Sequence, residues 1–476
     1  MKEIPKEEMI FNPLSFGDPN GRLFRWNEQL YRAIKPEVAG FYRDLLSNGT
    51  IQKLTGHGLV ETEVTDLEID GHGLILKHRE IPVVSYPPEW CAAMLKDASL
   101  VTLDLMKNLA DENLMLQDAH PWNILFDGTK PVFVDLGSII PIGSSSHWVA
   151  ADEFRRFFLH PLMLMAEGHG RVARWLLHDY DQGVLQSEAI ALSRIARRCF
   201  RPSRFREGVV RMGRQIVPLG LKGFLKERLR GAKAVVRRNT SPSQCMRQET
   251  DHLRSLVEEL PMADTRTEWS DYDRDCFPSF TPTAQWTPKH TSVQNVISTL
   301  QPSTLLDLGS NRGWFSQLAA RQGVCVIASD VDEPAITKLY HDARAEHLGI
   351  LPILLDFKYP EPGFGLRNEM FAPAIKRFRS DMVMALALVH HLVFKHRLNF
   401  EQIIAGLSPF VGRHLLVEFI APEDRYVREW NPERFPWYSL GRFQAVLKRE
   451  YSSITPFPSN LEHRTLLLCE RQAFET

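Results

Sequence analysis

The feature of the sequence that most constrains the fold is a glycine-containing turn, DLGSNRG, at residues 307–313. It lies between an apolar, strand-like run and a helical segment. Glycine at positions 309 and 313 allows the backbone to turn tightly and to approach a ligand closely. The first N–H groups of the following helix have no partner inside the helix, and open parallel sheets bind ligands at this carboxyl edge of their strands. The turn therefore predicts a ligand site in an α/β fold.

Apolar runs alternate with helical patterns around this turn, which is typical of a parallel sheet covered on both faces. Helices are expected at Trp314–Gln322 and Glu333–Ala345, and a later one at Leu440–Glu450. The expected strands are Thr304–Leu308, Val324–Ala328, Ile350–Leu355, Met382–Leu386, His414–Phe419, Ser452–Pro456 and Arg464–Cys469. We therefore predict a seven-stranded, Rossmann-like α/β sheet in the C-terminal part of the chain.

The composition changes near the middle of the chain, which suggests a domain boundary. Arg194–Asn239 holds fifteen Lys or Arg against two acids, whereas Arg247–Asp275 holds nine acids and four bases. We expect a first domain over residues 1–240, an acidic and Pro-containing linker over 241–285, and a second domain over 286–476. The basic stretch either docks a polyanion, an anionic lipid head group or an acidic glycan precursor, or forms solvated helix faces. We favour the solvated faces, and nucleic acid stays open as a partner.

Composition and charge exclude several classes of protein. The chain has 476 residues, of which 44% are hydrophobic, so it is not a disordered protein. Its 57 Lys plus Arg balance 58 Asp plus Glu, which argues against a general nucleic-acid coat protein or a cationic membrane binder. Six cysteines without a CxxC pair predict neither a zinc site nor a disulfide framework. With no signal peptide and no long apolar run, we expect a cytoplasmic protein without a membrane span or a metal site.

The acids around the glycine turn indicate the chemistry of the ligand. Neither GxGxxG nor GxxxxGK[ST] occurs there, which disfavours a pyrophosphate. Asp307 lies inside the first strand, and Asp330 ends the second strand 23 residues later, where a ribose-binding acid belongs. A carboxylate near the charged end of a cofactor suits a cation better than a pyrophosphate. S-adenosylmethionine (SAM) carries both an ammonium and a sulfonium.

The turn, the strand-end acid and the terminal strand pair resemble class I SAM-dependent methyltransferases over about residues 286–476. Asn311 stands where the usual GxGxG motif has its middle glycine. The resemblance implies that the methionine end of the cofactor is lined by Asp307, Gly309, Asn311 and Gly313. It also implies that Asp330 binds the ribose hydroxyls and that Asp356, at the end of the third strand, contacts adenine.

The substrate side of the cofactor is expected at the ends of the fourth and fifth strands. His390 and His391 follow the fourth strand, where either could deprotonate a hydroxyl or an amine, or instead hydrogen-bond a loop. Glu418 ends the fifth strand and either orients a polar acceptor or caps the following loop. The sequence lacks both an Asn-Pro-Pro-Tyr tetrad and a cysteine pair suited to base methylation, which favours transfer to oxygen, or to nitrogen of a small molecule.

The first half of the chain carries a second set of acids. QDAHPWNIL at residues 117–125 is followed by VDLG at 134–137, which gives Asp118, Asn123 and Asp135 the order of a proton-accepting acid and two magnesium ligands. The run resembles aminoglycoside-phosphotransferase-like kinases and implies an α+β kinase-like domain with ATP and magnesium. No GxGxxG loop precedes it, and Lys53 and Lys77 are nucleotide-binding lysines by default only. We therefore favour a degenerate module that helps bind or present the acceptor.

The order of the motifs over nearly the whole chain resembles a bacterial methyltransferase family that includes the rhizobial nodulation protein NoeA. This resemblance implies a SAM-dependent methyltransferase acting on an oxygen or nitrogen of a small molecule, a glycan or a lipid-linked precursor, in host-specific nodulation. Two alternatives stay open. One is a bifunctional methyltransferase and kinase, and the other is a non-catalytic, SAM-binding regulatory protein.

Overall fold

A computed structural model describes residues 2–12, 15–145, 147–200, 241–262, 267, 278–281 and 283–471. Their contacts divide the chain into two compact units. Unit 1 comprises Met1–Arg79, Leu95–Ile124 and Val132–Ala263, and unit 2 comprises Glu80–Met94, Leu125–Pro131 and Asp264–Thr476. Most of the basic stretch lies outside the described residues, as does part of the acidic segment. Within the described part, no helix has the length and apolar character needed to cross a membrane.

Unit 2 is built on a seven-stranded sheet with the strand order β14-β13-β12-β15-β16-β18-β17. The first five strands in this order are parallel, and β18 and β17 form an antiparallel pair at the edge beyond β16. The strands are β12 (Thr304–Leu308), β13 (Cys325–Asp330), β14 (Ile350–Leu354), β15 (Ser380–Ala385), β16 (Val411–Ile420), β17 (Ser453–Pro458) and β18 (Arg464–Glu470). The predicted seven-stranded α/β sheet is thus confirmed.

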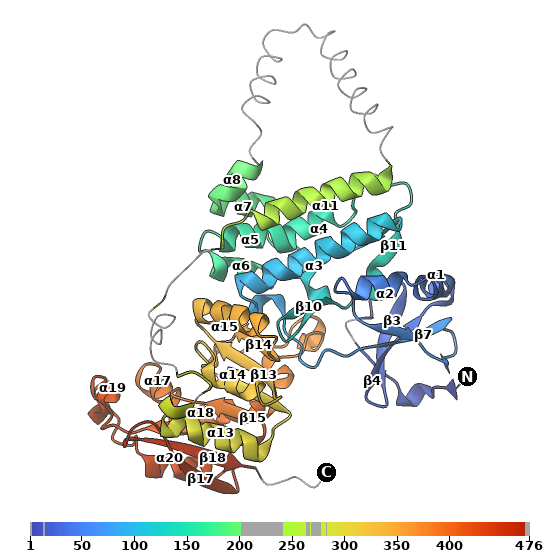
Figure 1. The fold of residues 1–476 in the computed structure, drawn as a ribbon. Helices are drawn as coiled ribbons and strands as arrows, with labels where there is room; N and C mark the ends of the chain where they lie inside the picture. Colours follow the sequence, from blue (N-terminus) through green and yellow to red (C-terminus); the bar gives the residue numbers. More distant parts are fainter. Residues whose placement is uncertain are drawn as a thin grey trace, which may run out of the picture. The chain divides into compact units, whose positions relative to one another are not determined.

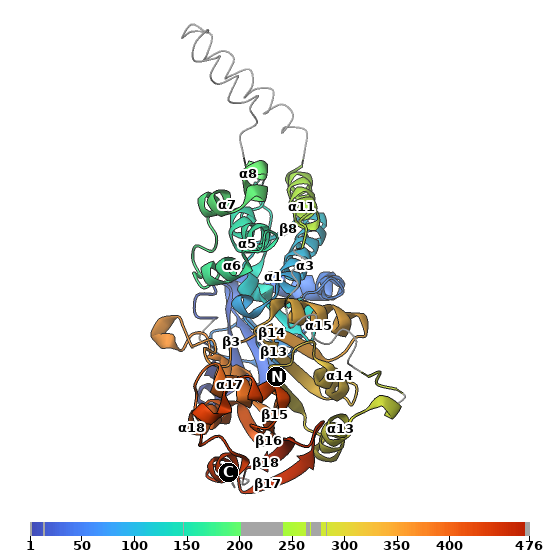
Figure 2. The same ribbon diagram turned by 90° about the vertical axis from the view of Figure 1, so that its left-hand side faces the viewer.

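Helices cover both faces of this sheet (Figures 1 and 2). On one face, Val296, Leu318 and Leu339 from three successive helices belong to one buried cluster with strand residues. The helices are α13 (Pro288–Leu300), α14 (Trp314–Ala320) and α15 (Glu333–Ala345) on that face, and α16 (Ala374–Arg377), α17 (Val389–Phe394), α18 (Phe400–Leu407), α19 (Arg425–Arg428) and α20 (Leu440–Leu447) later in the chain. Helices α15, α18, α19 and α20 begin at side-chain caps, for example at Asp332, whose carboxylate accepts a hydrogen bond from the N–H of Ala335.

Two segments from the first third of the chain belong to unit 2, and both are held by buried contacts. Trp90 packs edge-on against Phe126 with 5.0 Å between ring centroids, and Phe126 in turn packs against Tyr340 of α15. Glu89 is 2% exposed and forms a two-pronged ion pair with Arg377, with N–O distances of 2.5 and 2.9 Å. The fold of unit 2 therefore includes residues that lie far from it in the sequence.

Unit 1 begins with an antiparallel five-stranded sheet in the order β2-β3-β4-β7-β5. Aromatic side chains such as Phe24 and Tyr31, whose rings stack at 5.5 Å, pack against one another on it. The strands of the unit are β1 (Lys2–Glu3), β2 (Ile10–Phe11), β3 (Gly21–Trp26), β4 (Gln29–Ile34), β5 (Thr62–Val64), β6 (Leu67–Glu68), β7 (Leu74–His78), β8 (Leu114–Leu116) and β11 (Ile139–Pro141), while the hairpin of β9 (Ile124–Asp127) and β10 (Lys130–Phe133) crosses into unit 2.

The rest of unit 1 is largely helical. Helix α3 (Ala92–Asp111) starts in unit 2 and continues into unit 1. A one-turn π-helical segment, Arg155–Leu159, separates α4 from α5. The other helices are α1 (Pro36–Ser47), α2 (Thr50–Thr55), α4 (Ala151–Phe154), α5 (His160–Met165), α6 (Gly170–Leu176), α7 (Gln186–Leu192), α8 (Arg194–Phe200) and α11 (Pro242–Glu258).

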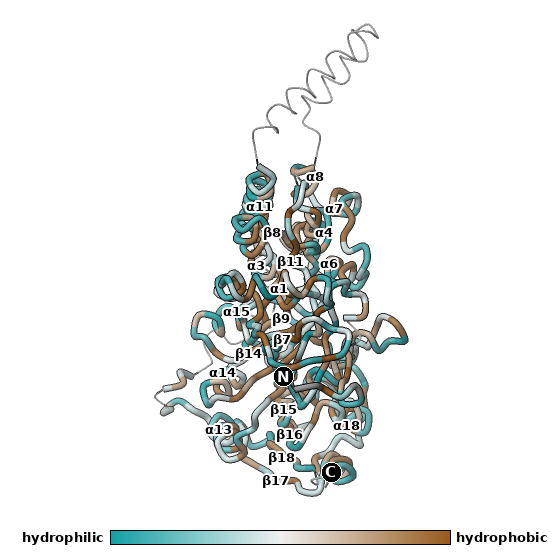
Figure 3. Tube along the Cα trace, turned by 90° about the vertical axis from the view of Figure 1, so that its right-hand side faces the viewer, coloured by the Kyte–Doolittle hydropathy of each residue, from teal (hydrophilic) through white to brown (hydrophobic). Residues whose placement is uncertain are grey.

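Helix α11 differs from the expected linker over residues 241–285. Its residues are mostly hydrophilic, as Figure 3 shows, yet Met246, Leu253 and Val257 are fully buried. Their spacing of seven and four residues places them in one narrow stripe along the helix. Arg254 pairs with Asp104 of α3, and Arg247 pairs with Asp111, so polar contacts also fix α11 in unit 1. A stripe this narrow inside a charged segment gives a weak periodic signal, which explains why the helix was not expected.

Candidate functional site

The residues predicted to bind the cofactor and the acceptor lie at the carboxyl edge of the parallel strands of unit 2. Asp307 and Gly309 are at the end of β12, and Asp330 ends β13. Because parallel strands end at the same edge of a sheet, residues that follow β14, β15 and β16 share this edge. The topology thus brings together two sets that the sequence separates by about a hundred residues.

The glycine turn is hydrogen-bonded to the end of the neighbouring strand. The N–H groups of Gly309 and Ser310 both donate to the carbonyl oxygen of Ser329 at 2.9 Å. Asn311 has a φ of 51°, and its N–H donates to the Asp330 carboxylate at 2.8 Å. These bonds fix the turn against β13.

The two glycines of the turn serve different purposes. Both have positive φ, 73° at Gly309 and 69° at Gly313. A Cβ atom at Gly309 would meet only Leu388 Cδ1, at an ordinary contact distance of 3.5 Å, whereas one at Gly313 would lie 2.5 Å from Leu339. A Cβ atom at Gly309 would therefore fit without a clash, whereas the absence of one at Gly313 allows α15 to pack closely.

Two buried carboxylates, those of Asp307 and Asp330, border the glycine turn. Asp307 is 3% exposed and accepts a hydrogen bond from the Ser316 hydroxyl at 2.6 Å. Burial and the nearby charge of Asp330 raise its pKa to about 6, while the Ser316 hydroxyl and the charge of Lys289 act in the opposite direction. Burial also raises the pKa of Asp330, although backbone N–H groups of Asp332 and Asn311 oppose this effect. Within the described part of the chain, neither carboxylate has an ion-pair partner within 4.0 Å.

Two further polar atoms of the turn are buried without a partner. The hydroxyl oxygen of Ser310 and the amide oxygen Oδ1 of Asn311 make no hydrogen bond to any described residue. A buried polar atom that lacks a partner costs about 1–3 kcal/mol, so such atoms are rare outside sites that receive water or a ligand. The turn therefore has hydrogen-bonding capacity that the protein itself leaves unused.

Asp356, the predicted adenine contact, lies just beyond β14 and is already engaged. Its carboxylate accepts a hydrogen bond from the N–H of Lys358 and pairs with the ammonium group of the same lysine, both at 2.9 Å. This local pair is partly exposed, so its contribution to stability is small.

Glu418 on β16 is completely buried and is the centre of a network. Its carboxylate pairs with the ammonium of Lys289 at 2.7 Å and accepts a hydrogen bond from the N–H of Ala387 at 3.0 Å. The hydroxyl of Ser459 donates to the other oxygen. Lys289 holds the pKa of Glu418 below its usual range even though burial alone would raise it. None of these three partners lies in the loop over residues 421–424, where Asp424 caps α19.

The network of Glu418 fixes a strained turn after β15. Ala387 has a φ of 51°, which costs a non-glycine residue about 1–3 kcal/mol and persists only where surrounding contacts impose it. The hydrogen bond from its N–H to Glu418 is such a contact. Glu418 therefore holds the turn between β15 and α17 through a direct hydrogen bond.

The two predicted catalytic histidines are on α17 and are largely buried. His390 stacks on Trp430 with an interplanar angle of 13°, and its Nδ1 has no partner among the described residues. Burial lowers the pKa of both rings, to about 4 for His391, and nearby positive charges lower each further. Both are neutral at pH 7 and weakly basic, which favours hydrogen bonding to a substrate over removal of its proton.

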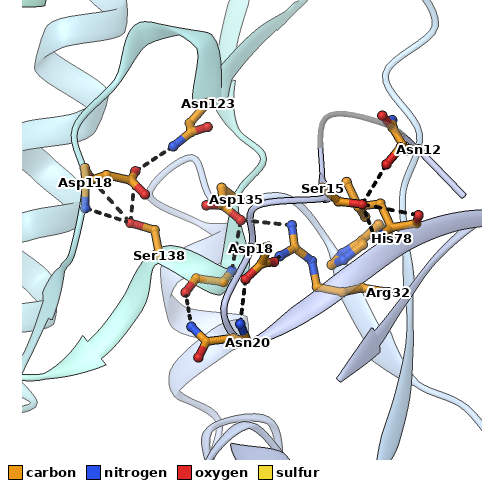
Figure 4. Close-up of polar contacts among 12 residues, drawn as sticks. Asn12, Ser15, Asp18, Asn20, Arg32, His78, Asp118, Asn123, Asp135 and Ser138 are labelled. Atoms are coloured by element: carbon orange, nitrogen blue, oxygen red, sulfur yellow. Dashed lines mark hydrogen bonds and ion pairs between the residues drawn. The ribbon is translucent and has the colours of Figure 1, made fainter. Parts of the chain in front are cut away.

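Two of the three residues that the kinase-like pattern singled out in unit 1, Asp118 and Asn123, are hydrogen-bonded to each other. The side-chain N–H of Asn123 donates to the Asp118 carboxylate at 2.6 Å, and the hydroxyl of Ser138 donates to the same oxygen at 3.2 Å. Burial raises the pKa of Asp118 to about 7, and the negative charges of Asp135 and Glu153 add to the effect. Figure 4 shows this cluster next to Asp135.

Neither lysine that sequence suggested for the nucleotide reaches these acids. Lys53 pairs with Glu112 at 2.9 Å, and Lys77 pairs with Glu63 at 3.4 Å. The cation at the cluster is instead Arg32 of β4, a residue that the sequence did not single out. Its guanidinium bridges Asp18 and Asp135, with 2.9 Å between Nη2 and the Asp135 carboxylate (Figure 4).

Sequence reasoning thus missed Arg32 and Lys289, the two buried cations of the candidate sites. A single basic residue in a strand or at the start of a helix forms no motif or periodic pattern by which the sequence would reveal its role. Only a buried position on an otherwise apolar element, such as Arg32 between Tyr31 and Ala33, hints at such a role.

Comparisons with known proteins give one relative along nearly the whole chain. No protein-family model matches. The chain is similar to the nodulation protein NoeA of Rhizobium meliloti (strain 1021), with 26% identity over 469 residues, covering 96% of this chain and 95% of that protein.

Among solved structures, three neighbours cover part of the chain. The magnesium protoporphyrin IX methyltransferase ChlM of Synechocystis PCC 6803, crystallised with bound SAH, is 17% identical and covers 43% of this chain and 93% of its own, with a TM-score of 0.31. Monomeric WbdD is 18% identical and covers 45% of this chain and 48% of its own, with a TM-score of 0.28. The methyltransferase domain of bacterial CtHen1 is 14% identical and covers 38% of this chain and 96% of its own, with a TM-score of 0.29.

Proposed function

We propose that unit 2 binds SAM at the carboxyl edge of its sheet and transfers the methyl group to an oxygen or nitrogen of an acceptor. One observation carries this proposal. Two buried carboxylates without an ion-pair partner, Asp307 and Asp330, border the same turn as the unpartnered oxygens of Ser310 and Asn311. An anion would be repelled there, whereas a ligand with cationic and hydroxyl groups would satisfy all four.

Each residue of this edge has a distinct role in the proposal. Asp307 and the unpartnered turn oxygens attract the methionine ammonium, and Gly309 leaves room for that end of the cofactor. Asp330 binds the ribose hydroxyls while Asn311 keeps its carboxylate in place. Asp356 contacts adenine after its pair with Lys358 has adjusted. Gly313 acts only through the packing of α15.

The bound cofactor supplies an electrophilic methyl group on a sulfonium, and the chain supplies orientation. His390 and His391 are neutral and hydrogen-bond the acceptor, whose own nucleophilicity then matters more than removal of its proton. Glu418 does not touch the acceptor in this proposal. It holds the Ala387 turn, which borders the point of transfer.

For the acceptor, we retain a small molecule, a glycan or a lipid-linked precursor, with a role in host-specific nodulation. The support is the similarity to NoeA, at 26% identity over almost the whole chain. We assign the methyltransferase domain to residues 286–476, together with the two segments from the first third of the chain that complete unit 2.

The proposal is tested by calorimetric titration of the full-length protein with SAM. Native protein is expected to bind, and Gly309→Arg is expected to lose at least about two orders of magnitude in affinity, because its side chain fills the place proposed for the methionine end of the cofactor. Gly323→Arg is a matched control: Gly323 has a similar positive φ of 86° and a Cβ there meets nothing within 4 Å, so the backbone strain is the same. A folded native protein that does not bind SAM would contradict the proposal.

A second measurement separates an enzyme from a SAM-binding regulator. The native protein is supplied with SAM and a panel of hydroxyl- and amine-bearing small molecules, glycans and lipid-linked sugars, and the release of S-adenosylhomocysteine is followed. Release that depends on one acceptor class supports methyl transfer. SAM binding without release on any class would favour the regulator.

A further inference from the structure

The acid cluster of unit 1 does not fit the magnesium and nucleotide that its kinase-like motif implies. In protein kinases, a lysine on the third strand of the sheet binds the nucleotide phosphates, and the second conserved acid holds magnesium. Here the third strand of the sheet along the chain, β4, presents Arg32, which is 3% exposed. The corresponding acid is Asp135.

Arg32 already uses the group that magnesium would need. Its Nη2 lies 2.9 Å from the Asp135 carboxylate, and its Nη1 hydrogen-bonds Asp18 (Figure 4). The guanidinium thus pairs with both carboxylates at once, and its single positive charge offsets one of their two negative charges. Magnesium requires nearly octahedral oxygen ligands, but Oδ1 of Asp135 is already bonded to Arg32 and to the N–H of Gly137, and the fixed positive charge beside it repels a second cation.

The loop that carries Asp18 is tied down over the cluster. The backbone N–H of Asn20 donates to Asp18 at 2.8 Å, and the side-chain amide of Asn20 donates to the carbonyl of Gly137 at 2.8 Å. The Tyr42 hydroxyl donates to the same carbonyl at 3.2 Å. The bonds of Asn20 hold residues 18–20, just before β3 and in the part of the sheet where a kinase has its phosphate-binding loop, against the residues after Asp135.

Protein atoms also fill the space next to Asp135. A Cβ atom built on Gly137 would lie 2.5 Å from Arg32 Nη1 and 3.0 Å from the Asp18 carboxylate. The guanidinium therefore packs directly on the backbone at Gly137. Asp18, Arg32 and Asp135 are thus joined by hydrogen bonds and packing. We call these three residues the Arg32 bridge.

We propose that the Arg32 bridge excludes magnesium and ATP from unit 1, so that the kinase-like site is closed by its own side chains. Arginine is suited to this, because its rigid fork bonds two carboxylates at once, whereas a lysine ammonium is a compact point charge. Nucleotide entry requires the bridge to open. Opening a buried ion pair lowers the apparent affinity by about a hundredfold or more.

The test compares magnesium–ATP binding by full-length native protein and by Arg32→Lys, using calorimetry. Lysine breaks one arm of the bridge and restores the residue type that binds phosphates. We expect no detectable binding at millimolar ATP by the native protein and measurable binding by Arg32→Lys. Asp18→Asn is a second variant, which releases the loop and leaves the Arg32 to Asp135 pair, so its gain should be smaller. Arg22→Lys is the control. Arg22, on β3, lies over the ring of Phe11 on β2 and is not part of the bridge, so this variant should behave like the native protein.

Two results would overturn the proposal. One is magnesium–ATP binding by the native protein at micromolar concentrations. The other is the absence of binding by both Arg32→Lys and Asp18→Asn, when near-ultraviolet circular dichroism shows that the variants are folded, since the bridge would then not be what excludes the nucleotide. Hydrogen exchange over residues 15–22 gives an independent readout: it should be faster in Asp18→Asn than in Arg22→Lys.

Discussion

Two pairs of aspartates in this protein differ in whether a cation of the protein forms an ion pair with them. At the carboxyl edge of unit 2, Asp307 and Asp330 are buried without an ion-pair partner in the described part of the chain, and burial raises the pKa of both. In unit 1, Asp18 and Asp135 share the guanidinium of Arg32. Among the described residues, the first pair of acids has no ion-pair partner, whereas the second pair has one, although Asp118 beside it also lacks a cation and has a pKa that burial and neighbouring negative charges raise to about 7.

This contrast shows that a motif of acids does not define a binding site until its counter-charges are known. A buried carboxylate without a cation lowers stability and is a candidate for function, whereas a carboxylate paired with an internal cation contributes to the fold. In the sequence, Asp307 and Asp330 matched a cofactor-binding pattern, and Asp135 matched a magnesium-ligand pattern. Only their partners distinguish them.

The largest effect is expected from removal of the cation in unit 1. Arg32→Met leaves two carboxylates around a buried apolar side chain and should lower the free energy of unfolding of unit 1 by about 3–5 kcal/mol. Chemical denaturation and hydrogen exchange of peptides from unit 1 measure the change. Arg22→Met, on the neighbouring strand, should cost about 1 kcal/mol or less. Equal losses in the two variants would mean that the bridge has no special role.

A smaller effect is expected from neutralising an acid in unit 2. Asp330→Asn should weaken SAM binding about tenfold to a hundredfold, because hydrogen bonds to a charged acceptor contribute about 1.5–3 kcal/mol. Calorimetry with SAM gives the affinity. Asp342→Asn, on the exposed side of α15 where Asp342 pairs with Lys338, is the control and should bind SAM normally. If Asp330→Asn binds as tightly as the control, the acid does not contact the cofactor.

The unpaired state of Asp307 predicts an unusual pH dependence. Its pKa is raised to about 6 in the folded protein, against a usual value of 3.8. Between these values the unfolded chain has lost the proton and the folded protein has kept it, so this group makes stability fall as pH rises from about 4 to about 6. Asp307→Asn should remove that slope and, at pH 7, stabilise the protein without ligand by about 1–2 kcal/mol.

Denaturation of both proteins across this pH range checks the prediction. The difference between the two curves isolates Asp307 from other groups that titrate. A difference that is constant with pH would show that Asp307 has an ordinary pKa. Addition of SAM should reduce the difference, because a bound ammonium favours the ionised carboxylate.

The smallest effect is expected at the acceptor side. His391→Gln should leave SAM affinity within about twofold of the native value, because the ring is proposed to contact the acceptor only. The same titration measures it. A loss as large as that of Asp330→Asn would move His391 to the cofactor side of the site.

The C-terminal sheet could be predicted from sequence because its strands are buried on both faces. Such strands read as continuous apolar runs, and Thr304–Leu308 was placed with the same bounds that β12 has. The glycine turn was recognisable because positive φ at Gly309 and Gly313 restricts the choice of residue. Both constraints act on neighbouring residues in the chain, so both can be recognised in the sequence.

What could not be predicted depends on distant partners. The Arg32 bridge joins residues more than one hundred positions apart, and the pair of Lys289 with Glu418 joins residues 129 positions apart. No local pattern records which cation faces which acid. The same reason hid the ion pair of Glu89 with Arg377, which anchors an early segment in unit 2.

The presence of Glu80–Met94 and Leu125–Pro131 in unit 2 has a consequence for the synthesis of the protein. A ribosome makes these segments long before it makes Arg377 and Tyr340, which cover them. Until then Trp90 and Phe126 have no sheet to pack on, so their apolar surface stays exposed on the nascent chain. The N-terminal half therefore cannot complete its burial before residue 377 has been made, and a chain that stops before that point leaves a surface that favours aggregation or chaperone capture.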